Sequence, residues 1–306
     1  MLLTSDTMPL ASAAIERAAH HRTDTDWLQT AFKAPDVLVC LFQNGRPLVQ
    51  DGGGLLWLGP QAASLPDIRQ RLFLGTDKAG AGVFALDMGD GFKLAASPIA
   101  GLADFGDARM AFGAMPPMDA NLASTARSLF EWHRSHGFCA NCGHETIVQE
   151  AGWKRGCEAC KREHFPRTDP VAIMLAVRGD HCLLGRQSLW PAGFFSCLAG
   201  FVEPGETVEQ AAVRELKEEA GISSNAASAE YLFAQPWPFP SSLMIGLIVQ
   251  AESEEITVDE TELDEARWFT RQEARDIIAG THSEVFAPPE MAVAHHILRV
   301  WSERDS

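Results

Sequence analysis

Three glutamates lie close together in the stretch "GFVEPGETVEQAAVRELKEEAGI", residues 200–222. In an α-helix, the spacing of Glu215, Glu218 and Glu219 brings their carboxylates to one face. Carboxylates that converge in this way repel one another and have raised pKa values unless a cation lies among them. Oxygen ligands of this kind suit Mg²⁺ or Mn²⁺, which a substrate phosphate can share. The pattern therefore indicates metal-assisted chemistry at a phosphate.

The residues around these glutamates predict the helix that must position them. Arg214 precedes the cluster and can orient a carboxylate through its planar guanidinium. Gly200 and Gly205 permit tight turns before the helix, and Gly221 suits its C-terminal cap. A charged, solvated helix face is the alternative, but such a face would not require these glycines. The apolar face of the helix recurs every four residues, at Val208, Ala212, Leu216 and Ala220.

Two CxxC pairs lie in "CANCGHETIVQEAGWKRGCEAC", separated by fourteen residues. Two thiolates on a tight turn can bind one zinc ion, and a second such pair completes a closed tetrahedral site. Disulfides or a redox CxxC are the alternatives, but a reducing compartment and the paired arrangement argue against them. His144 and His164 lie nearby, although four thiolates already fill the coordination shell. We expect a structural zinc ion bound by Cys139, Cys142, Cys157 and Cys160.

The zinc module is locally basic. A solvated surface is the ordinary interpretation of such charges, and contact with RNA is the alternative. The basic residues are Lys154, Arg155, Lys161, Arg162 and Arg167. The other cysteines, Cys40, Cys182 and Cys197, lie in apolar segments, and we expect buried free thiols there.

Composition limits the partners and the compartment. The 306 residues carry a net charge of −16, which argues against a polyanion-binding groove as the main activity. A small phosphorylated ligand held through a divalent cation is compatible with that charge. No apolar run reaches the length of about 18 residues that a membrane span requires. The N-terminus lacks a basic region and contains Asp6, so we expect no signal peptide and a cytoplasmic protein.

The elements expected along the chain form a mixed α/β protein. Residues 36–42 and 47–50 predict two strands joined at Asn44-Gly45, and "GLLWLG" and "GVFALDM" predict further strands. "LPDIRQRLF" predicts a short helix, and residues 122–136 a longer one that leads into the first CxxC. "DPVAIMLAV" predicts a strand buried on both faces, and "HCLLGRQ" its hairpin partner.

A proline-rich segment, "QPWPFPSS", begins 13 residues after Ile222. Proline lacks a backbone N–H, which bars this segment from helices and central strands. By itself the segment is either a structural corner or a rigid loop that presents Trp237 and Phe239 to a ligand.

The pattern G-x5-E-x7-R-E-L-x-E-E-x-G-I in residues 200–222 matches the Nudix box in full. A four-cysteine zinc ribbon before the box and "AQPWPFPSS" after it resemble the NADH pyrophosphatase subfamily of Nudix hydrolases. The lead-in "ARSLFEWHRSHGFCANCG" and the link "HFPRTDP" are also similar to that subfamily. The resemblance covers residues 123–306 with specific motifs, and residues before 123 by position alone.

The resemblance implies a fold and an activity. We expect an N-terminal mixed α/β domain at 1–128, the zinc ribbon at 129–166, and a Nudix α/β/α sandwich with a mixed sheet at 167–306. Members of the family hydrolyse NADH to reduced nicotinamide mononucleotide and AMP, and some remove NAD caps from RNA 5′ ends. They often form homodimers, which we expect here too. The substrates that the resemblance implies are therefore NADH, NAD⁺ or a related dinucleotide, and an NAD-capped RNA end.

The resemblance also assigns roles to residues. Glu215 and Glu219 are the expected metal ligands, with Glu218 beside them and Glu262 as a downstream acidic ligand, while Arg214 belongs to the catalytic group. Glu206 is expected to support the helix start. The general base stays open among Glu215, Glu219, Glu262 and a metal-bound hydroxide. The expected nucleotide pocket consists of Phe165, Phe201, Gln235, Pro236, Trp237, Pro238, Phe239, Pro240, Ser241, Ser242 and Ala294.

Two positions depart from the subfamily pattern, and two alternative functions stay open. Ala234 stands where the signature begins with Ser, and Gly152 stands where some members carry Glu near the substrate. One alternative is a broader hydrolase of ADP-ribose or other dinucleotides. The other is a non-catalytic nucleotide sensor with a zinc-ribbon interaction module, against which the complete set of box glutamates argues.

Overall fold

The computed structural model describes residues 7–11 and 15–304 as two compact units. The C-terminal unit contains Asp169–Pro236 and, of the described residues, 242–304, together with residues 7–9. The N-terminal unit contains Leu10–Thr168 and the short segment Trp237–Ser241. The expectation about a signal peptide rests on Asp6, which lies outside the described residues. Within the described ranges, no helix combines the length and apolar character needed to cross a membrane.

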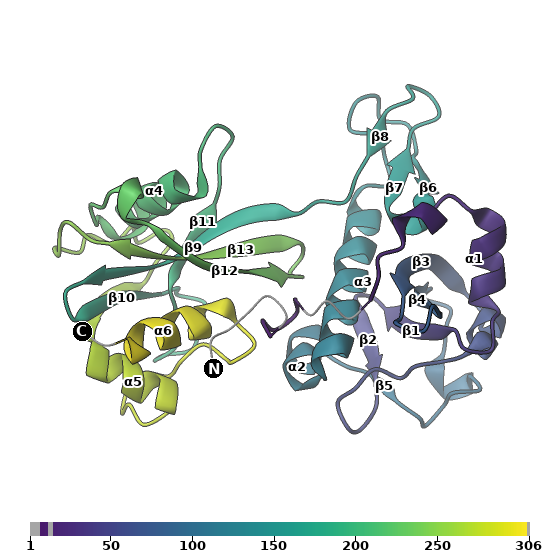
Figure 1. The fold of residues 1–306 in the computed structure, drawn as a ribbon, viewed down its shortest axis with the longest axis horizontal. Coiled ribbons are helices and arrows are strands. Elements are labelled where there is room, and N and C mark those ends of the chain that lie inside the picture. The colour runs from purple at the N-terminus through teal and green to yellow at the C-terminus, as the bar shows by residue number, and fades with distance from the viewer. Residues whose placement is uncertain (1–6, 12–14, 305–306) are drawn as a thin grey trace. The chain divides into compact units, whose positions relative to one another are not determined.

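The C-terminal unit is built on a mixed six-stranded sheet in the order β12-β13-β9-β10-β14, with β11 also paired to β9 (Figure 1). The long strand β9 runs parallel to β13 and antiparallel to β10 and β11. It is buried along nearly its whole length, as its continuous apolar sequence predicts. The strands are β9 (Asp169–Arg178), β10 (His181–Arg186), β11 (Leu198–Phe201), β12 (Glu230–Trp237), β13 (Ser242–Gln250) and β14 (Glu265–Thr270).

Helices cover both faces of this sheet, which confirms the α/β/α sandwich (Figure 1). Helix α4 (Val208–Ala220) packs on one face against β9, β11 and β13. Its buried residues Ala212 and Leu216 belong to a core shared with Met174 of β9. Helices α5 (Arg271–Ala279) and α6 (Val293–Glu303) pack together on the other face.

The N-terminal unit contains a five-stranded sheet in the order β3-β4-β1-β2-β5. The predicted hairpin is present, because β1 and β2 pair antiparallel around Asn44 and Gly45, whose φ values of 53° and 73° suit a tight hairpin turn. Strand β4 pairs parallel to β1 and is completely buried. The strands are β1 (Leu38–Gln43), β2 (Arg46–Val49), β3 (Ile68–Thr76), β4 (Gly82–Met88) and β5 (Asp104–Phe105).

Three α-helices accompany this sheet. Helix α1 (Thr25–Phe32) packs against β4, whereas α3 (Pro117–Ser135) packs against β2 and β3. The predicted helix at 122–136 is confirmed as α3, which starts five residues earlier because Pro117 suits the first helical turn. The remaining helices are α2 (Ala108–Ala114) and the 3-10 helices Ala19–His21, Pro60–Ser64, Leu94–Ala96, Glu150–Gly152 and Ala226–Ser228.

Two predictions for the N-terminal unit were wrong. The segment "LPDIRQRLF" is the strand β3 rather than a helix, because the buried strand β4 needs a partner for its backbone groups. The segment "GLLWLG" forms only isolated bridges at Leu55 and Leu58. There the buried carboxylate of Asp119 accepts hydrogen bonds from the Leu55 N–H and the Trp57 indole, so side-chain bonding replaces a strand ladder.

The cysteine-rich segment forms a small antiparallel sheet of β6 (Ile147–Gln149), β7 (Lys154–Gly156) and β8 (Glu163–His164). Its four cysteines lie in the turns beside these strands. The three remaining cysteines are buried free thiols, as predicted, at Cys40, Cys182 and Cys197.

Candidate metal centre and substrate loop

Helix α4 is held firmly at both ends. Thr207 caps its N-terminus, and the Gln210 side chain bonds back to the Thr207 N–H, which completes a capping box. Gly221 ends the helix in a left-handed conformation, at φ 71°, as its position in the sequence predicts. The helix therefore presents its glutamates from a fixed scaffold.

A cluster of three carboxylates lies at this helix. Oxygens of Glu215, Glu219 and Glu262 all lie within 4.8 Å of one another, and Glu215 and Glu219 are buried. Glu262 comes from the turn that precedes β14, and this turn is tied to α4 because the Asp259 N–H donates to the Glu219 carbonyl at 3.0 Å. Glu262, which the resemblance implied as a downstream ligand, thus lies beside Glu215 and Glu219 although more than forty positions separate it from them in the chain.

The electrostatics of the carboxylate cluster favour a cation. Burial raises the pKa of Glu219 to about 8, and the neighbouring Glu215 and Glu262 add to this effect. Burial also raises the pKa of Glu215, although Arg214 partly offsets the rise. Two buried carboxylates and an exposed one, all oxygen donors, fit Mg²⁺ or Mn²⁺, which would remove the penalty on the ionised forms of the buried pair.

Arg214 organises the acidic residues around the cluster. Its guanidinium donates to both Glu206 oxygens at 2.7 and 3.0 Å, and to Glu215 Oε1 at 2.8 Å. It also donates to Glu218 Oε2 at 2.8 Å and to the Phe201 carbonyl at 2.9 Å. Arg214 therefore fixes one oxygen of Glu215 and links the helix to the preceding loop.

The structure separates Glu218 from the other box glutamates. Its exposed carboxylate pairs with Arg214 and does not belong to the group formed by Glu215, Glu219 and Glu262. Glu206 has a related role, since its bidentate contact with Arg214 lowers its pKa and anchors the loop before α4. These two glutamates position the arginine, whereas the three clustered carboxylates offer oxygens to a metal.

The glycine at position 200 makes room for the Glu215 carboxyl group. It lies in β11, paired with Ala172 of β9. A Cβ atom at this position would lie 1.8 Å from Cδ of Glu215. The absent side chain therefore leaves the space that the Glu215 carboxylate occupies.

The four predicted zinc ligands converge. Cys139 and Cys160 have their Sγ atoms 3.6 Å apart, and Cys142 and Cys157 have theirs 3.5 Å apart. A tetrahedral ion with Zn–S bonds of about 2.3 Å places its sulfurs about 3.8 Å apart, so the donor set fits zinc. His164 Nε2 lies 3.3 Å from Cys139 Sγ, which places the histidine beside a thiolate rather than in its place.

The basic residues of the zinc module are not all part of a solvated surface. Arg155 is buried and donates to Thr146 Oγ1 at 2.7 Å and to the Thr146 carbonyl at 2.8 Å. Lys154 pairs with Glu150 and Glu163 at 2.6 and 2.8 Å. Contact with RNA through the exposed Lys161 and Arg162 stays a prediction.

The proline-rich segment has two structurally different parts. Its first part ends β12, the edge strand of the sheet, where proline is tolerated. Gln235 is fully buried there. Its Nε2 donates to the Pro9 and Met291 carbonyls at 3.0 and 2.8 Å, and its Oε1 accepts from the Val293 N–H at 2.8 Å. Gln235 thus has a structural role where the resemblance implied a pocket residue.

The second part, Trp237–Ser241, belongs to the N-terminal unit. Arg127 of α3 donates to the Pro238 carbonyl, and Ser128 donates to the Pro240 carbonyl at 3.1 Å. The Phe239 ring lies 5.3 Å from the Trp237 ring and 5.9 Å from the Phe112 ring. Trp237–Ser241, called the substrate loop below, is therefore held by α2 and α3.

Two arginines also contact the Phe239 ring. The guanidinium carbons of Arg109 and Arg127 lie 4.3 and 4.8 Å from the ring centroid. Residues of α2 and α3 were absent from the predicted site, because no local signal connects them with a segment about 110 positions later in the chain.

The other predicted pocket residues differ in accessibility. Phe165 and Phe201 expose 60% and 59% of their surface, so both rings are available to a ligand. Ser242 begins β13 and is partly exposed. Ala294 is buried in α6, where its carbonyl accepts from Cys197 Sγ, so its side chain supports packing.

Comparisons with known proteins identify the family. The description "NADH pyrophosphatase-like rudimentary NUDIX domain" matches residues 36–132, "NADH pyrophosphatase zinc ribbon domain" matches 134–165, and "NUDIX domain" matches 166–287. A human relative named NAD-capped RNA hydrolase NUDT12 is 35% identical over 94% of this chain and 71% of its own length. The chain belongs to the NADH pyrophosphatase family of Nudix hydrolases.

Two further relatives of this Nudix hydrolase come from a bacterium and a plant. The NAD-capped RNA hydrolase NudC of Mycobacterium bovis is 34% identical over 96% of this chain and 94% of its own length. Nudix hydrolase 19, chloroplastic, of Arabidopsis thaliana is 31% identical over 88% of this chain and 76% of its own length. The N-terminal sheet is thus a rudimentary Nudix domain, which its sequence did not reveal because it lacks the acidic box.

Gly200→Ala should lower the activity of the Nudix hydrolase without changing its fold. The added Cβ would displace the Glu215 carboxylate, and a misplacement of about 1 Å can lower the rate about 100-fold. We expect such a loss of kcat on NADH with an unchanged circular dichroism spectrum. Gly52→Ala is the control, because no atom lies within 4 Å of its added Cβ. Wild-type kcat in Gly200→Ala would contradict the geometry.

Mg²⁺ binding should release about one proton at pH 7. Metal-free Glu219, with a pKa of about 8, is mostly protonated at that pH, whereas the metal binds the ionised form. Affinity should rise about tenfold per pH unit up to about pH 8 and then level off. Isothermal titration calorimetry in buffers of different ionisation enthalpy measures the proton. Glu255→Gln should behave as wild type, and proton release that persists in Glu219→Gln would contradict the assignment.

Arg127→Gln should loosen the substrate loop, because it removes the guanidinium group that donates to the Pro238 carbonyl. A hydrogen bond from a charged donor contributes about 1.5–3 kcal/mol, so we expect KM for NADH to rise at least about tenfold while kcat stays within about threefold. The exposed Arg46→Gln is the matched control from the same unit. An unchanged KM in Arg127→Gln would show that the loop does not contact the substrate.

Proposed function

We propose that this Nudix hydrolase cleaves the diphosphate of NADH and NAD⁺ to nicotinamide mononucleotide and AMP, and that it removes NAD caps from RNA 5′ ends. The observation that carries the proposal is the cluster of Glu215, Glu219 and Glu262 beside the Nudix helix. The family descriptions and the relatives named as NAD-capped RNA hydrolases support the choice of substrate.

The reaction adds water to one phosphorus and breaks the bond between that phosphorus and the bridging oxygen. The products are two phosphate monoesters, and protons pass to the solvent. A divalent cation, when bound, supplies charge stabilisation to the diphosphate and activates the attacking water. Mg²⁺ and Mn²⁺ both fit the oxygen donors, and we propose Mg²⁺ or Mn²⁺ as the physiological ion.

The protein's own residues prepare the site for this step. Glu215, Glu219 and Glu262 would hold the cation, and Arg214 keeps one oxygen of Glu215 in place. Glu206 and Glu218 hold the arginine in turn. Because these contacts are formed before any ligand binds, the carboxylates need little rearrangement during the reaction.

Aromatic side chains supply recognition of the flat rings of a dinucleotide. Stacking on an aromatic side chain contributes about 1–3 kcal/mol per base. The exposed Phe165 and Phe201 and the substrate loop with Trp237 are the surfaces that we propose for this role. Proline fixes φ in the loop and so lowers the entropy lost on binding. Ala234 lacks the hydroxyl of the family signature and contributes no polar contact from its side chain.

Initial rates on four substrates test the proposed function. In the presence of Mg²⁺ we expect a higher kcat/KM for NADH, NAD⁺ and NAD-capped RNA than for ADP-ribose. Glu219→Gln should lower kcat at least about 100-fold, because it weakens a cation that stabilises the transition state by several kcal/mol. The exposed Glu255→Gln should retain wild-type rates.

Two outcomes would contradict this assignment, each in a different way. Faster hydrolysis of ADP-ribose than of NADH would favour the broader dinucleotide hydrolase. Unchanged hydrolysis by Glu219→Gln at saturating Mg²⁺ would remove the catalytic role of the cluster.

A further inference from the structure

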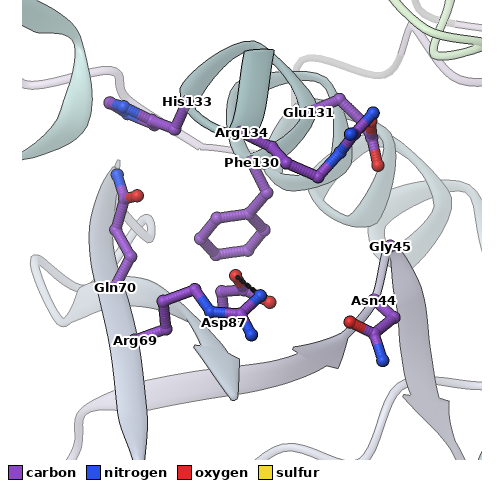
Figure 2. A pocket seen from close by; sticks show the side chains of 9 residues that line it. All are labelled: Asn44, Gly45, Arg69, Gln70, Asp87, Phe130, Glu131, His133 and Arg134. Carbon is purple, nitrogen blue, oxygen red and sulfur yellow. Dashed lines mark hydrogen bonds and ion pairs between the residues drawn. The ribbon is translucent and has the colours of Figure 1, made fainter. Parts of the chain in front are cut away.

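A second site candidate lies in the rudimentary Nudix domain, away from the residues assigned above. A cavity of about 390 Å³ lies between α3, the strands β3 and β4, and the turn from β1 to β2 (Figure 2). This volume is within the range of about 300–1,000 Å³ that small-molecule sites occupy. The residues that line it are Asn44, Gly45, Arg69, Gln70, Asp87, Phe130, Glu131, His133 and Arg134.

Hydrogen-bond acceptors lie in the interior of this cavity. The side chains of Asp87 and Glu131 are only 12% and 18% exposed. Among the described residues, Asp87 forms an ion pair with Arg69, at the long distance of 3.5 Å. Glu131 Oε2 accepts two hydrogen bonds from Arg134, which leaves the second oxygen of Glu131 outside that contact. The interior therefore suits a ligand with N–H donors.

Burial raises the pKa of Asp87 to about 6, and Asp90 and Glu131 contribute to the rise while Arg69 opposes it. The carboxyl group is thus mostly ionised at neutral pH. The mostly buried Asp87 carboxylate lies 3.5 Å from Arg69, so hydrogen bonds donated by a ligand would stabilise it further.

One buried donor in the cavity wall also lacks a partner. Gln70 Nε2 is inaccessible to solvent and makes no hydrogen bond within the described part of the chain. Such groups are rare in proteins, because an unmade hydrogen bond at a buried donor costs about 1–3 kcal/mol. In Figure 2 the Gln70 amide extends along the cavity wall toward α3. Because Nε2 is covered, the amide has to turn toward the cavity before a carbonyl or ring nitrogen of a ligand can accept from it.

The cationic residues lie at the outer part of the cavity. Arg69 and Arg134 have side chains that are 43% and 71% exposed, much more than the two inner carboxylates. Arg69 reaches Asp90 at 3.2 Å, and Arg134 reaches Glu131 at 2.7 Å. Guanidinium groups at a rim suit an anionic group that stays partly in solvent, and phosphate matches their geometry.

An aromatic ring separates the two walls. Phe130 projects from α3 into the cavity, between the Gln70 side and the Asn44 side (Figure 2). The Phe42 ring lies beside the Phe130 ring, with the ring centroids 5.6 Å apart. The cavity thus combines a flat apolar surface, inner acceptors, one inner donor and outer cations.

We propose that this cavity binds a nucleoside monophosphate, with the amino or carboxamide edge of its base near Asp87, Glu131 and Gln70 and its phosphate near Arg69 and Arg134. A planar base with N–H donors forms hydrogen bonds with the carboxylates of Asp87 and Glu131. An acceptor atom on the same base accepts a hydrogen bond from the Gln70 amide. Binding here does not depend on the proposed hydrolysis, although both products of that reaction belong to the same chemical class.

AMP titration of the full-length protein, without added Mg²⁺, tests the site. We follow the side-chain amide signal of Gln70 by ¹H–¹⁵N NMR, and Gln70→Leu identifies that signal by its loss. AMP should shift the signal saturably. Adenosine and ribose 5-phosphate, which each lack one end of the ligand, should bind at least about tenfold more weakly. Nicotinamide mononucleotide serves as a second probe with a carboxamide edge.

Variants locate the two ends of the ligand. Asp87→Asn and Arg69→Gln should each weaken the binding that this signal reports at least about tenfold, whereas the exposed Lys78→Gln should not. Circular dichroism verifies folding, and Arg134→Gln, at a more exposed residue, replaces Arg69→Gln if that variant is unstable. A Gln70 signal that does not respond to AMP would overturn the proposal, as would equal responses to AMP and ribose 5-phosphate.

Discussion

The gathering of three carboxyl groups beside α4, two of them buried, is the constraint on which the proposed metal site depends. Raising the pKa of Glu219 from 4.5 to about 8 corresponds to a penalty of about 5 kcal/mol on its ionised form. A cation removes that penalty, so the site is complementary to a metal before any substrate binds. The surrounding residues bring these carboxyl groups together. Gly200 leaves space for Glu215, and Arg214 fixes the orientation of the Glu215 carboxylate. The turn at Asp259 brings Glu262 to the helix.

Two features of the N-terminal unit belong to the recognition that we propose. Its helices α2 and α3 hold the substrate loop through Arg127, Ser128 and Phe112. The same helix α3 also forms a wall of the cavity around Phe130. We propose that this domain, which lacks the acidic box, takes part in recognition.

Local sequence patterns predicted what depends on local spacing. The helix 208–220, the buried strand 169–178 and the zinc ribbon follow from periodicity, caps and CxxC spacing. Patterns failed where distant residues decide, as for β3, whose partner β4 overrides a weak helical signal. The Gln235 amide bonds to Pro9 and Met291, and the pocket role that the resemblance implied for it stays a prediction. The domain boundaries at 128 and 166, the homodimer, the choice of Mn²⁺ and the cytoplasmic location stay predictions.

The central claim is that Glu215, Glu219 and Glu262 together bind the catalytic cation. Anomalous diffraction from crystals soaked in Mn²⁺ tests it most directly, because the signal locates the ion independently of any assay. We predict a peak within about 2.0–2.3 Å of one oxygen from each of the three carboxylates, near the distances that small divalent cations prefer. A peak elsewhere, or none at this cluster in crystals that diffract well, would contradict the account.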